Sequence, residues 1–171
     1  MSAKSSLALR KESSTGQLLE MCSVRVGQTV FGLPITHILE IVGDAHPQRV
    51  PLAPDFVGGL VHYRGDVLTT VSMRHLLGLP GDYSEEKNGK EGGEGHHDIL
   101  VLECSGGCFG LLVDSVGEVL TVSSEDHEPN PSTLDQRRSA LFAGAYKLPQ
   151  GLLVMLDPER LDPIRLGAAA G

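Results

Sequence analysis

Short apolar runs separated by glycine- and proline-containing turns dominate the chain from residue 18 onward. Within Leu18–Val26 the apolar residues recur with a period of two, which is typical of a half-buried strand. Gly27-Gln28 forms a tight-turn signal before a second apolar run, Thr29–Leu33. This pattern predicts that the ordered part of the chain begins with a β-hairpin.

The run from residue 55 to 79 is the most informative part of the chain. Two apolar segments, Phe56–Tyr63 and Val67–Val71, flank Arg64-Gly65-Asp66. A Gly-Asp step between β-branched and aromatic residues predicts a tight turn, because glycine adopts positive φ without steric cost. The apolar residues of 73–77 then follow helical spacing before a glycine. We therefore expect a strand, a turn, a strand and one short helix.

The second half repeats this arrangement of apolar runs. Asp98–Cys104 and Cys108–Val113 flank Ser105-Gly106-Gly107, which predicts another hairpin. Leu141–Tyr146 and Leu152–Leu156 predict a closing hairpin. The whole pattern predicts an all-β fold.

Two further short helices are predicted beside the strands. Pro34 suits a first helical turn, and the apolar residues of 35–42 follow helical spacing. Asp157 is a good N-cap residue, and Pro158 fits the first helical position after it.

The remaining segments predict irregular structure. Residues 1–16 are rich in serine and charge, which is typical of a disordered N-terminal tail. Residues 80–97, rich in glycine, glutamate and lysine, predict a flexible loop. We expect 43–54 and 123–139 to cross between strands, and 163–171 to be a C-terminal tail.

Composition and charge narrow the class of protein. The 171 residues are enough for one domain or two small subdomains, and 21 glycines with 10 prolines favour short elements joined by turns. A net charge of −8 opposes binding to nucleic acid or to an anionic membrane, so proteins are the expected partners. No apolar run reaches the roughly 18 residues that span a bilayer, so no membrane insertion is expected.

The N-terminus and the cysteines indicate a reduced compartment. The first residues are polar and carry no apolar core with a small-residue cleavage site, so secretion is not expected. Three cysteines, an odd number, do not predict a disulfide framework. A cytoplasmic protein is expected.

Patterns of catalytic or metal chemistry are weak, so we expect neither an enzyme nor a cofactor. Ser115 beside Asp114 lacks the G-x-S-x-G frame, and no phosphate-binding loop occurs. His96-His97 are adjacent, and Cys104 with Cys108 supplies one C-x3-C pair without a second. A solvated loop and buried thiols are favoured there, and a small metal-binding protein is the weaker alternative.

Two motifs resemble the CheW family of chemotaxis adaptors. The first includes Arg49-Val50-Pro51 and continues through the 55–79 run. The second, Gly110–Val119, reproduces the signature G-x-x-V-D-x-V-x-x-V at all five fixed positions. Thr69 stands where proline is usual, and Ser72 where an acid or amide is usual. The resemblance covers residues 18–162.

The resemblance implies a fold and a function. Members of the family fold as two small Src-homology-3-like β-barrel subdomains packed together, with one or two short helices. Applied to this chain, it implies a CheW-like domain over 17–162, with a first barrel over about 30–80 and a second over about 98–150. The terminal strands could cross over between the barrels. The resemblance also suggests that Glu40-Ile41-Val42, at the end of the 35–42 segment, turns back into strand.

The implied function is a non-catalytic scaffold. Such a scaffold couples the cytoplasmic tip of methyl-accepting chemoreceptors to the regulatory domain of a CheA-like histidine kinase. The alternative, motivated by Thr69, Ser72 and the 80–97 loop, is an adaptor of type IV pilus motility or another chemosensory-like pathway.

By resemblance, five residues are candidates for partner binding: Ile38, Glu40, Gly59, Arg64 and Val116. Arg64 could contact a receptor or pair with Glu40 to hold the turn, and the two roles are compatible. Gly59 would allow close approach of another backbone or of a partner helix. Ile38 and Val116 would be core residues by default, whereas the family places these positions near a receptor cleft.

Overall fold

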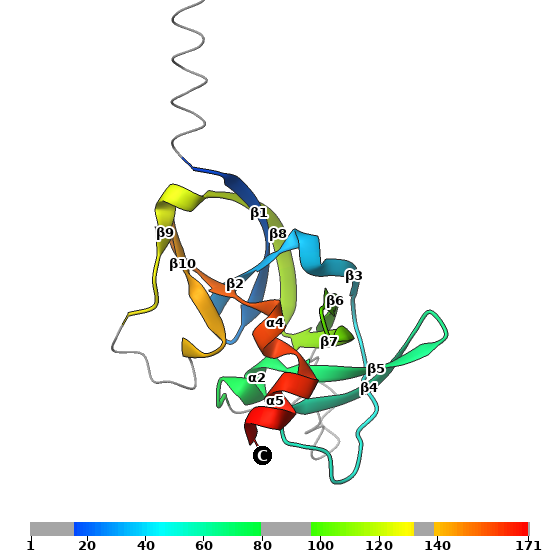
Figure 1. The fold of residues 1–171 in the computed structure, drawn as a ribbon. Helices are drawn as coiled ribbons and strands as arrows, with labels where there is room; N and C mark the ends of the chain where they lie inside the picture. The colour runs from blue at the N-terminus through cyan, green and yellow to red at the C-terminus, as the bar shows by residue number, and fades with distance from the viewer. Residues whose placement is uncertain (1–15, 80–96, 132–138, 171) are drawn as a thin grey trace, which may run out of the picture.

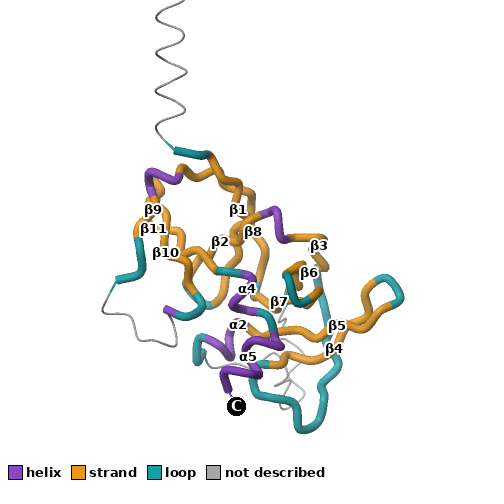
Figure 2. The backbone as a smooth tube through the Cα atoms, viewed as in Figure 1, coloured by secondary structure: helices purple, strands orange, loops and turns teal. Residues whose placement is uncertain are grey.

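A computed structural model of the chain describes residues 16–79, 97–131 and 139–170. The predicted tail at 1–16 and the predicted loop at 80–97 lie outside the described residues, apart from Gly16 and His97. The described part consists mainly of strands in two sheets, which confirms the all-β class (Figures 1 and 2).

The larger sheet contains six strands and joins the first hairpin to the last one. Its order is β8-β1-β2-β11-β10-β9, and the contact between β2 and β11 is parallel. Its strands are β1 (Leu18–Val26), β2 (Thr29–Pro34), β8 (Ser115–Ser123), β9 (His127–Glu128), β10 (Phe142–Leu148) and β11 (Gly151–Leu156).

The second sheet contains five strands in the order β3-β6-β7-β5-β4. Two antiparallel hairpins, β4–β5 and β6–β7, meet in it through a parallel contact between β5 and β7. Its strands are β3 (Ile38–Val42), β4 (Val57–Tyr63), β5 (Asp66–Ser72), β6 (Asp98–Cys104) and β7 (Gly107–Val113).

Four predicted hairpins are confirmed. In the β4–β5 turn, Arg64 has φ of 49° and Gly65 has φ of 82°, so both central residues lie in the left-handed region. This is the geometry of a two-residue turn whose twist matches that of the flanking strands. Arg64 is thereby held at the tip of the hairpin.

The helices are short, and two of the predictions about them need correction. Helical spacing predicted a helix in 35–42, but the segment contains only one 3-10 turn, η1 (Ile35–His37), before it extends as β3. The return to strand at Glu40-Ile41-Val42, which the resemblance suggested, is confirmed. The predicted C-terminal tail, 163–171, contains a helix instead, α5 (Pro163–Ala170), because Asp162 Oδ1 accepts the backbone N–H of Ile164 at 2.9 Å. The others are α2 (Met73–Leu76), η2 (Ser124–Asp126) and α4 (Pro158–Leu161).

The capped helix after β11 is confirmed. Asp157 Oδ1 accepts the backbone N–H of Glu159 at 3.1 Å, and Pro158 occupies the first turn. Leu161 at the end of α4 is fully buried, so this short helix is anchored by packing as well as by its cap.

The expected division into barrels over about 30–80 and 98–150 does not match the sheets. β6 and β7 of the second half pair with β3 and β5 of the first half. Likewise β8 pairs with β1, and β11 pairs with β2. Hairpins are local and leave a sequence signal, whereas the partner of a hairpin's outer strand depends on backbone groups far away in the chain.

One core cluster joins the two sheets. It includes Cys22, Phe31 and Leu156 from the larger sheet, and Leu102 and Phe109 from the other. Phe31 stacks in a tilted arrangement on another core aromatic, with ring centroids 5.8 Å apart. The two sheets therefore bury apolar side chains against each other, and this burial is the main contribution to stability.

Candidate functional site

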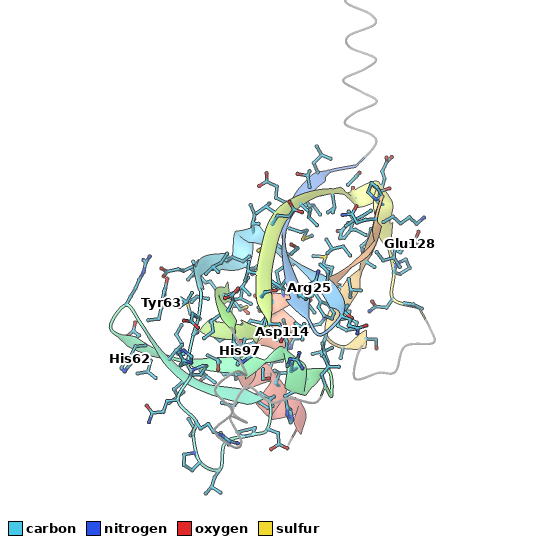
Figure 3. The ribbon with its side chains drawn as sticks, turned by 180° about the vertical axis from the view of Figure 1, so that it is seen from behind. Arg25, His62, Tyr63, His97, Asp114 and Glu128 are labelled. Carbon is cyan, nitrogen blue, oxygen red and sulfur yellow. The ribbon has the colours of Figure 1, made fainter. Side chains whose placement is uncertain are left out.

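The tip of the β4–β5 hairpin reaches the edge strand β3. Arg64 Nε lies 3.8 Å from Glu40 Oε2, and the two side chains are 74% and 43% exposed. The Arg64 guanidinium also lies 5.3 Å from the centre of the Tyr63 ring. Figure 3 shows Tyr63 on this hairpin. The predicted pairing of Arg64 with Glu40 is therefore confirmed.

Tyr63 completes a small polar cluster with these two residues. Its pKa is raised, first by loss of solvent around the phenol, with Arg64 opposing the rise and Glu40 adding to it. The Glu40 carboxylate therefore acts on the phenol at the tip of the hairpin. Glu40, Tyr63 and Arg64, called the hairpin-tip cluster below, present a carboxylate, a phenol and a guanidinium on one exposed surface.

Apolar side chains surround Glu40 on its own strand. Leu39, Ile41 and Val42 of β3 are 45%, 46% and 38% exposed. β3 is an edge strand, paired only with β6 among the described strands. Exposed apolar residues beside an oriented charge pair are the composition expected of a surface that binds another protein.

Gly59 is explained by contacts within this chain. Its φ of +128° is outside the range that other residues adopt readily, and a Cβ there would lie 2.6 Å from the Gln48 carbonyl oxygen. Gln48 and Leu60 exchange two backbone hydrogen bonds of 2.8 Å beside it. The expected close approach is therefore made by the segment around residues 47–48.

Ile38 and Val116 lie in different sheets. Ile38 opens β3 opposite Leu102, and Val116 lies on β8 opposite Val24. Both are half-buried and pack against the main core, as their default assignment predicted. The structure thus brings Glu40 and Arg64 together, and it places Gly59, Ile38 and Val116 in separate surroundings.

The sequence did not reveal that its two family motifs are joined by an ion pair. Arg74 of α2 donates to Asp114 from Nε and from Nη2, each at 2.7 Å. Asp114 Oδ2 also accepts the backbone N–H of Gly27 at 2.8 Å, which links the pair to the β1–β2 turn. Figure 3 shows Asp114 beside Arg25, whose carbonyl accepts the Asp114 N–H.

The sequence places both residues directly after strands, but only the sheet topology shows that these strands are neighbours. Arg74 follows β5, and Asp114 follows β7. Because β5 and β7 are parallel neighbours, their carboxyl ends lie at the same edge of the sheet. The spacing of the two motifs along the chain gives no indication of that neighbourhood.

The cysteines that the sequence paired as C-x3-C have different surroundings. Cys104 is buried and Cys108 is exposed, on adjacent strands of one hairpin. Burial, and then the nearby Glu159, Asp162 and Asp157 carboxylates, raise the pKa of Cys104 to about 12. The prediction of buried thiols is therefore confirmed at Cys104 and wrong at Cys108, which is exposed.

No helix among the described residues combines the length and apolar character needed to cross a membrane.

Comparison with known proteins agrees with the motifs. A family model for the CheW-like domain matches residues 20–163. The chemotaxis protein CheW of Rhizobium meliloti is 27% identical over 144 residues, covering 84% of this chain and 87% of that protein. The chemotaxis protein CheW of Helicobacter pylori is 27% identical over 158 residues, covering 92% and 90%.

A solved structure gives the same result for the fold. The crystal structure of a CheW scaffolding protein from Thermoanaerobacter tengcongensis superposes with a TM-score of 0.67. The match covers 82% of this chain and 90% of that one, at 23% sequence identity. Because the family model spans most of the chain and the strand arrangement agrees, the chain belongs to the CheW family.

Proposed function

We propose that the protein is a non-catalytic chemotaxis scaffold that works in the cytoplasm. It would couple the cytoplasmic tip of methyl-accepting chemoreceptors to the regulatory domain of a CheA-like histidine kinase. Family membership supports this function, and relatives that cover most of the chain bear the name chemotaxis protein CheW.

The observation that carries the proposal is the hairpin-tip cluster beside the exposed apolar face of β3. A charge pair at 3.8 Å with both partners exposed contributes little to the stability of the fold. We therefore infer that its role is to bind a partner. The guanidinium can donate to carbonyl or carboxylate oxygens of a receptor helix, while Glu40 and Tyr63 orient it. Val42, two residues after Glu40 on β3 and 38% exposed, would supply an apolar contact for the same partner.

The remaining candidates have other roles in this proposal. Ile38 would set the position of β3 from the core side, and Val116 would do the same for β8. Gly59 would hold the 47–48 segment against β4, so its replacement would act through the shape of the surface. We therefore assign direct contact to Glu40 and Arg64.

The proposal is tested by measuring binding to a receptor-tip fragment and, separately, to the kinase regulatory domain. We expect Arg64→Ala and Glu40→Ala each to weaken receptor binding by about 10-fold or more, which corresponds to about 1.4 kcal/mol or more for each truncation. The matched control is Lys147→Ala, because Lys147 forms an exposed pair with Glu128 at 2.7 Å on the larger sheet. This control should bind like wild type.

Two results would count against the proposal. If wild type binds neither the kinase domain nor any receptor fragment, the fold serves another pathway. If Lys147→Ala weakens receptor binding as much as Arg64→Ala, general charge rather than the hairpin-tip cluster governs association. Added salt tests the second result. Association that depends only on general charge should weaken strongly, because exposed charges are screened over about 10 Å at 0.1 M.

The pilus alternative loses one of its motives in the structure. Ser72 precedes α2, and its Oγ accepts the backbone N–H of His75 at 3.2 Å as an N-cap. An acidic or amide residue would cap the helix equally well, so this departure has a structural explanation. Receptor fragments from flagellar and pilus pathways, compared in the same binding assay, distinguish the two functions.

A further inference from the structure

Three side chains with metal-binding chemistry converge outside the hairpin-tip cluster. A ring nitrogen of His37, the sulfur of Cys104 and a carboxylate oxygen of Glu159 all lie within 4.8 Å of one another. They come from η1, the end of β6, and α4, which are remote in sequence. η1 and α4 each lie against β6, so the convergence follows from packing of the fold (Figure 1).

We propose that His37, Cys104 and Glu159 form a binding site for a divalent transition metal of the Zn²⁺ class. A thiolate, an imidazole and a carboxylate together form a donor set suited to Zn²⁺, whereas Mg²⁺ and Ca²⁺ prefer oxygen ligands alone. Ligand atoms around tetrahedral zinc are roughly 3.5 Å apart, given bonds of about 2.0–2.3 Å. Small side-chain movements would close the present spacing to that value.

The histidine is already oriented as a metal ligand would be. His37 Nδ1 lies 3.0 Å from the Glu103 carbonyl oxygen, which can only accept a hydrogen bond. In the neutral ring, Nδ1 therefore carries the proton and Nε2 has the lone pair. A backbone carbonyl that accepts from one ring nitrogen while the other binds metal is the usual arrangement around histidine ligands.

The glutamate is also held in place and charged. Ser105 donates to Glu159 twice, from its backbone N–H to Oε1 at 2.9 Å and from its hydroxyl to Oε2 at 2.7 Å. These bonds lower the pKa of Glu159. Each carboxylate oxygen retains a further lone pair, so metal coordination is compatible with both hydrogen bonds.

The surrounding charge favours a cation. After burial, the carboxylates of Glu159, Asp162 and Asp157 also raise the pKa of the Cys104 thiol, so an ion that binds here must displace the thiol proton. Asp162 also packs against the β6–β7 turn, where a Cβ added at Gly106 would overlap its carboxylate. Arg160 already pairs with Asp157 at 3.1 Å, and a divalent ion would offset the negative charge that remains on Glu159 and Asp162.

Occupancy would connect both sheets. η1 directly follows β2 of the larger sheet, Cys104 ends a strand of the other, and α4 follows β11. With three protein ligands, one position of a tetrahedral ion stays open for water or for a ligand from a partner. The metal would thus stabilise the fold and leave a reactive position at the surface.

The test uses Co²⁺ as a spectroscopic substitute for Zn²⁺ on the full chain. Wild type should bind one equivalent of Co²⁺ and show a thiolate-to-cobalt charge-transfer band. Zn²⁺ should displace the Co²⁺ and raise the Tm of the protein. Cys104→Ser and His37→Ala should each abolish the band and weaken Zn²⁺ binding by at least about 100-fold, measured by competition with a chelator. Cys108→Ser, which changes an exposed thiol on the neighbouring strand, should keep both properties.

A double variant tests whether the adjacent histidines bind the metal instead. The double variant His96→Ala/His97→Ala removes the adjacent histidine pair that the sequence offers as a competing site. Binding with the charge-transfer band retained in this variant supports the proposal. The proposal is overturned if Cys104→Ser still binds as wild type does, if the double variant loses binding, or if no stoichiometric metal binds. Circular dichroism of each metal-free variant confirms that it is folded.

Discussion

Two ion pairs of the same chemistry differ in what they contribute. Arg74 and Asp114 are about one-quarter to one-fifth exposed and form two hydrogen bonds of 2.7 Å. Arg64 and Glu40 are largely exposed and separated by 3.8 Å. Solvent screens the second pair, whereas the first also satisfies a backbone N–H of the β1–β2 turn. We therefore assign a role in stability to the Arg74–Asp114 pair and a role in partner recognition to the Arg64–Glu40 pair.

This difference predicts unequal effects on stability. Asp114→Asn should lower the free energy of unfolding by about 2 kcal/mol, because hydrogen bonds to charged groups contribute about 1.5–3 kcal/mol. Arg64→Ala should lower it by less than about 1 kcal/mol. Chemical denaturation of both variants checks this. Equal losses would mean that Arg64 has a structural role, and the interpretation of its binding defect would then be wrong.

At the scale of elements, β4 depends on a segment that the sequence described only as irregular. Gln48 forms a two-way backbone bridge with Leu60, and this bridge requires that Gly59 carry no side chain. Gly65, in the next turn, also has positive φ, but a Cβ there would meet nothing within 4 Å. Substitution of Gly65 would therefore introduce backbone strain alone, whereas substitution of Gly59 would introduce backbone strain and a clash with the Gln48 backbone.

We expect Gly59→Ala to destabilise the protein by about 2–4 kcal/mol, through strain and loss of the bridge. Gly65→Ala should cost about 1 kcal/mol, since only the left-handed conformation is penalised. Denaturation measures both values, and hydrogen exchange at the Leu60 amide should accelerate in the first variant alone. Similar losses in both variants would show that the bridge contributes little.

At the scale of the whole molecule, both sheets should unfold together. Cys22 of the larger sheet and Cys104 of the other belong to the same core cluster, and both thiols are buried. Burial raises the pKa of Cys22, and it is the first cause of the value of about 12 for Cys104. A raised thiol pKa keeps the group protonated at neutral pH, and the protonated form is unreactive.

Thiol labelling tests this cooperativity. At about pH 8, metal-free protein should react rapidly at Cys108 alone, and Cys22 and Cys104 should react only as the protein unfolds. Mass spectrometry across a denaturant series should show both buried thiols becoming reactive over the same range. Labelling of Cys104 well before Cys22 would mean that the second sheet opens independently.

Local chemistry in the sequence determined much of this fold. The period-two runs with their glycine turns predicted the four hairpins, and Asp157-Pro158 predicted the cap of α4. The long motifs also indicated the family and the pairing of Arg64 with Glu40. These features depend on neighbours a few residues apart, or on motifs that can be read directly along the chain.

Only the tertiary structure decided which hairpins share a sheet. Parallel contacts between β5 and β7 and between β2 and β11 interleave the halves, so the two sheets do not divide at the bounds of 30–80 and 98–150 expected for the barrels. The β5–β7 contact brings Arg74 to Asp114, whereas the β3–β6 pairing and the packing of α4 on β6 bring His37, Cys104 and Glu159 together. Backbone hydrogen bonding and shared apolar burial select these partners across long separations, and no local periodicity encodes that choice.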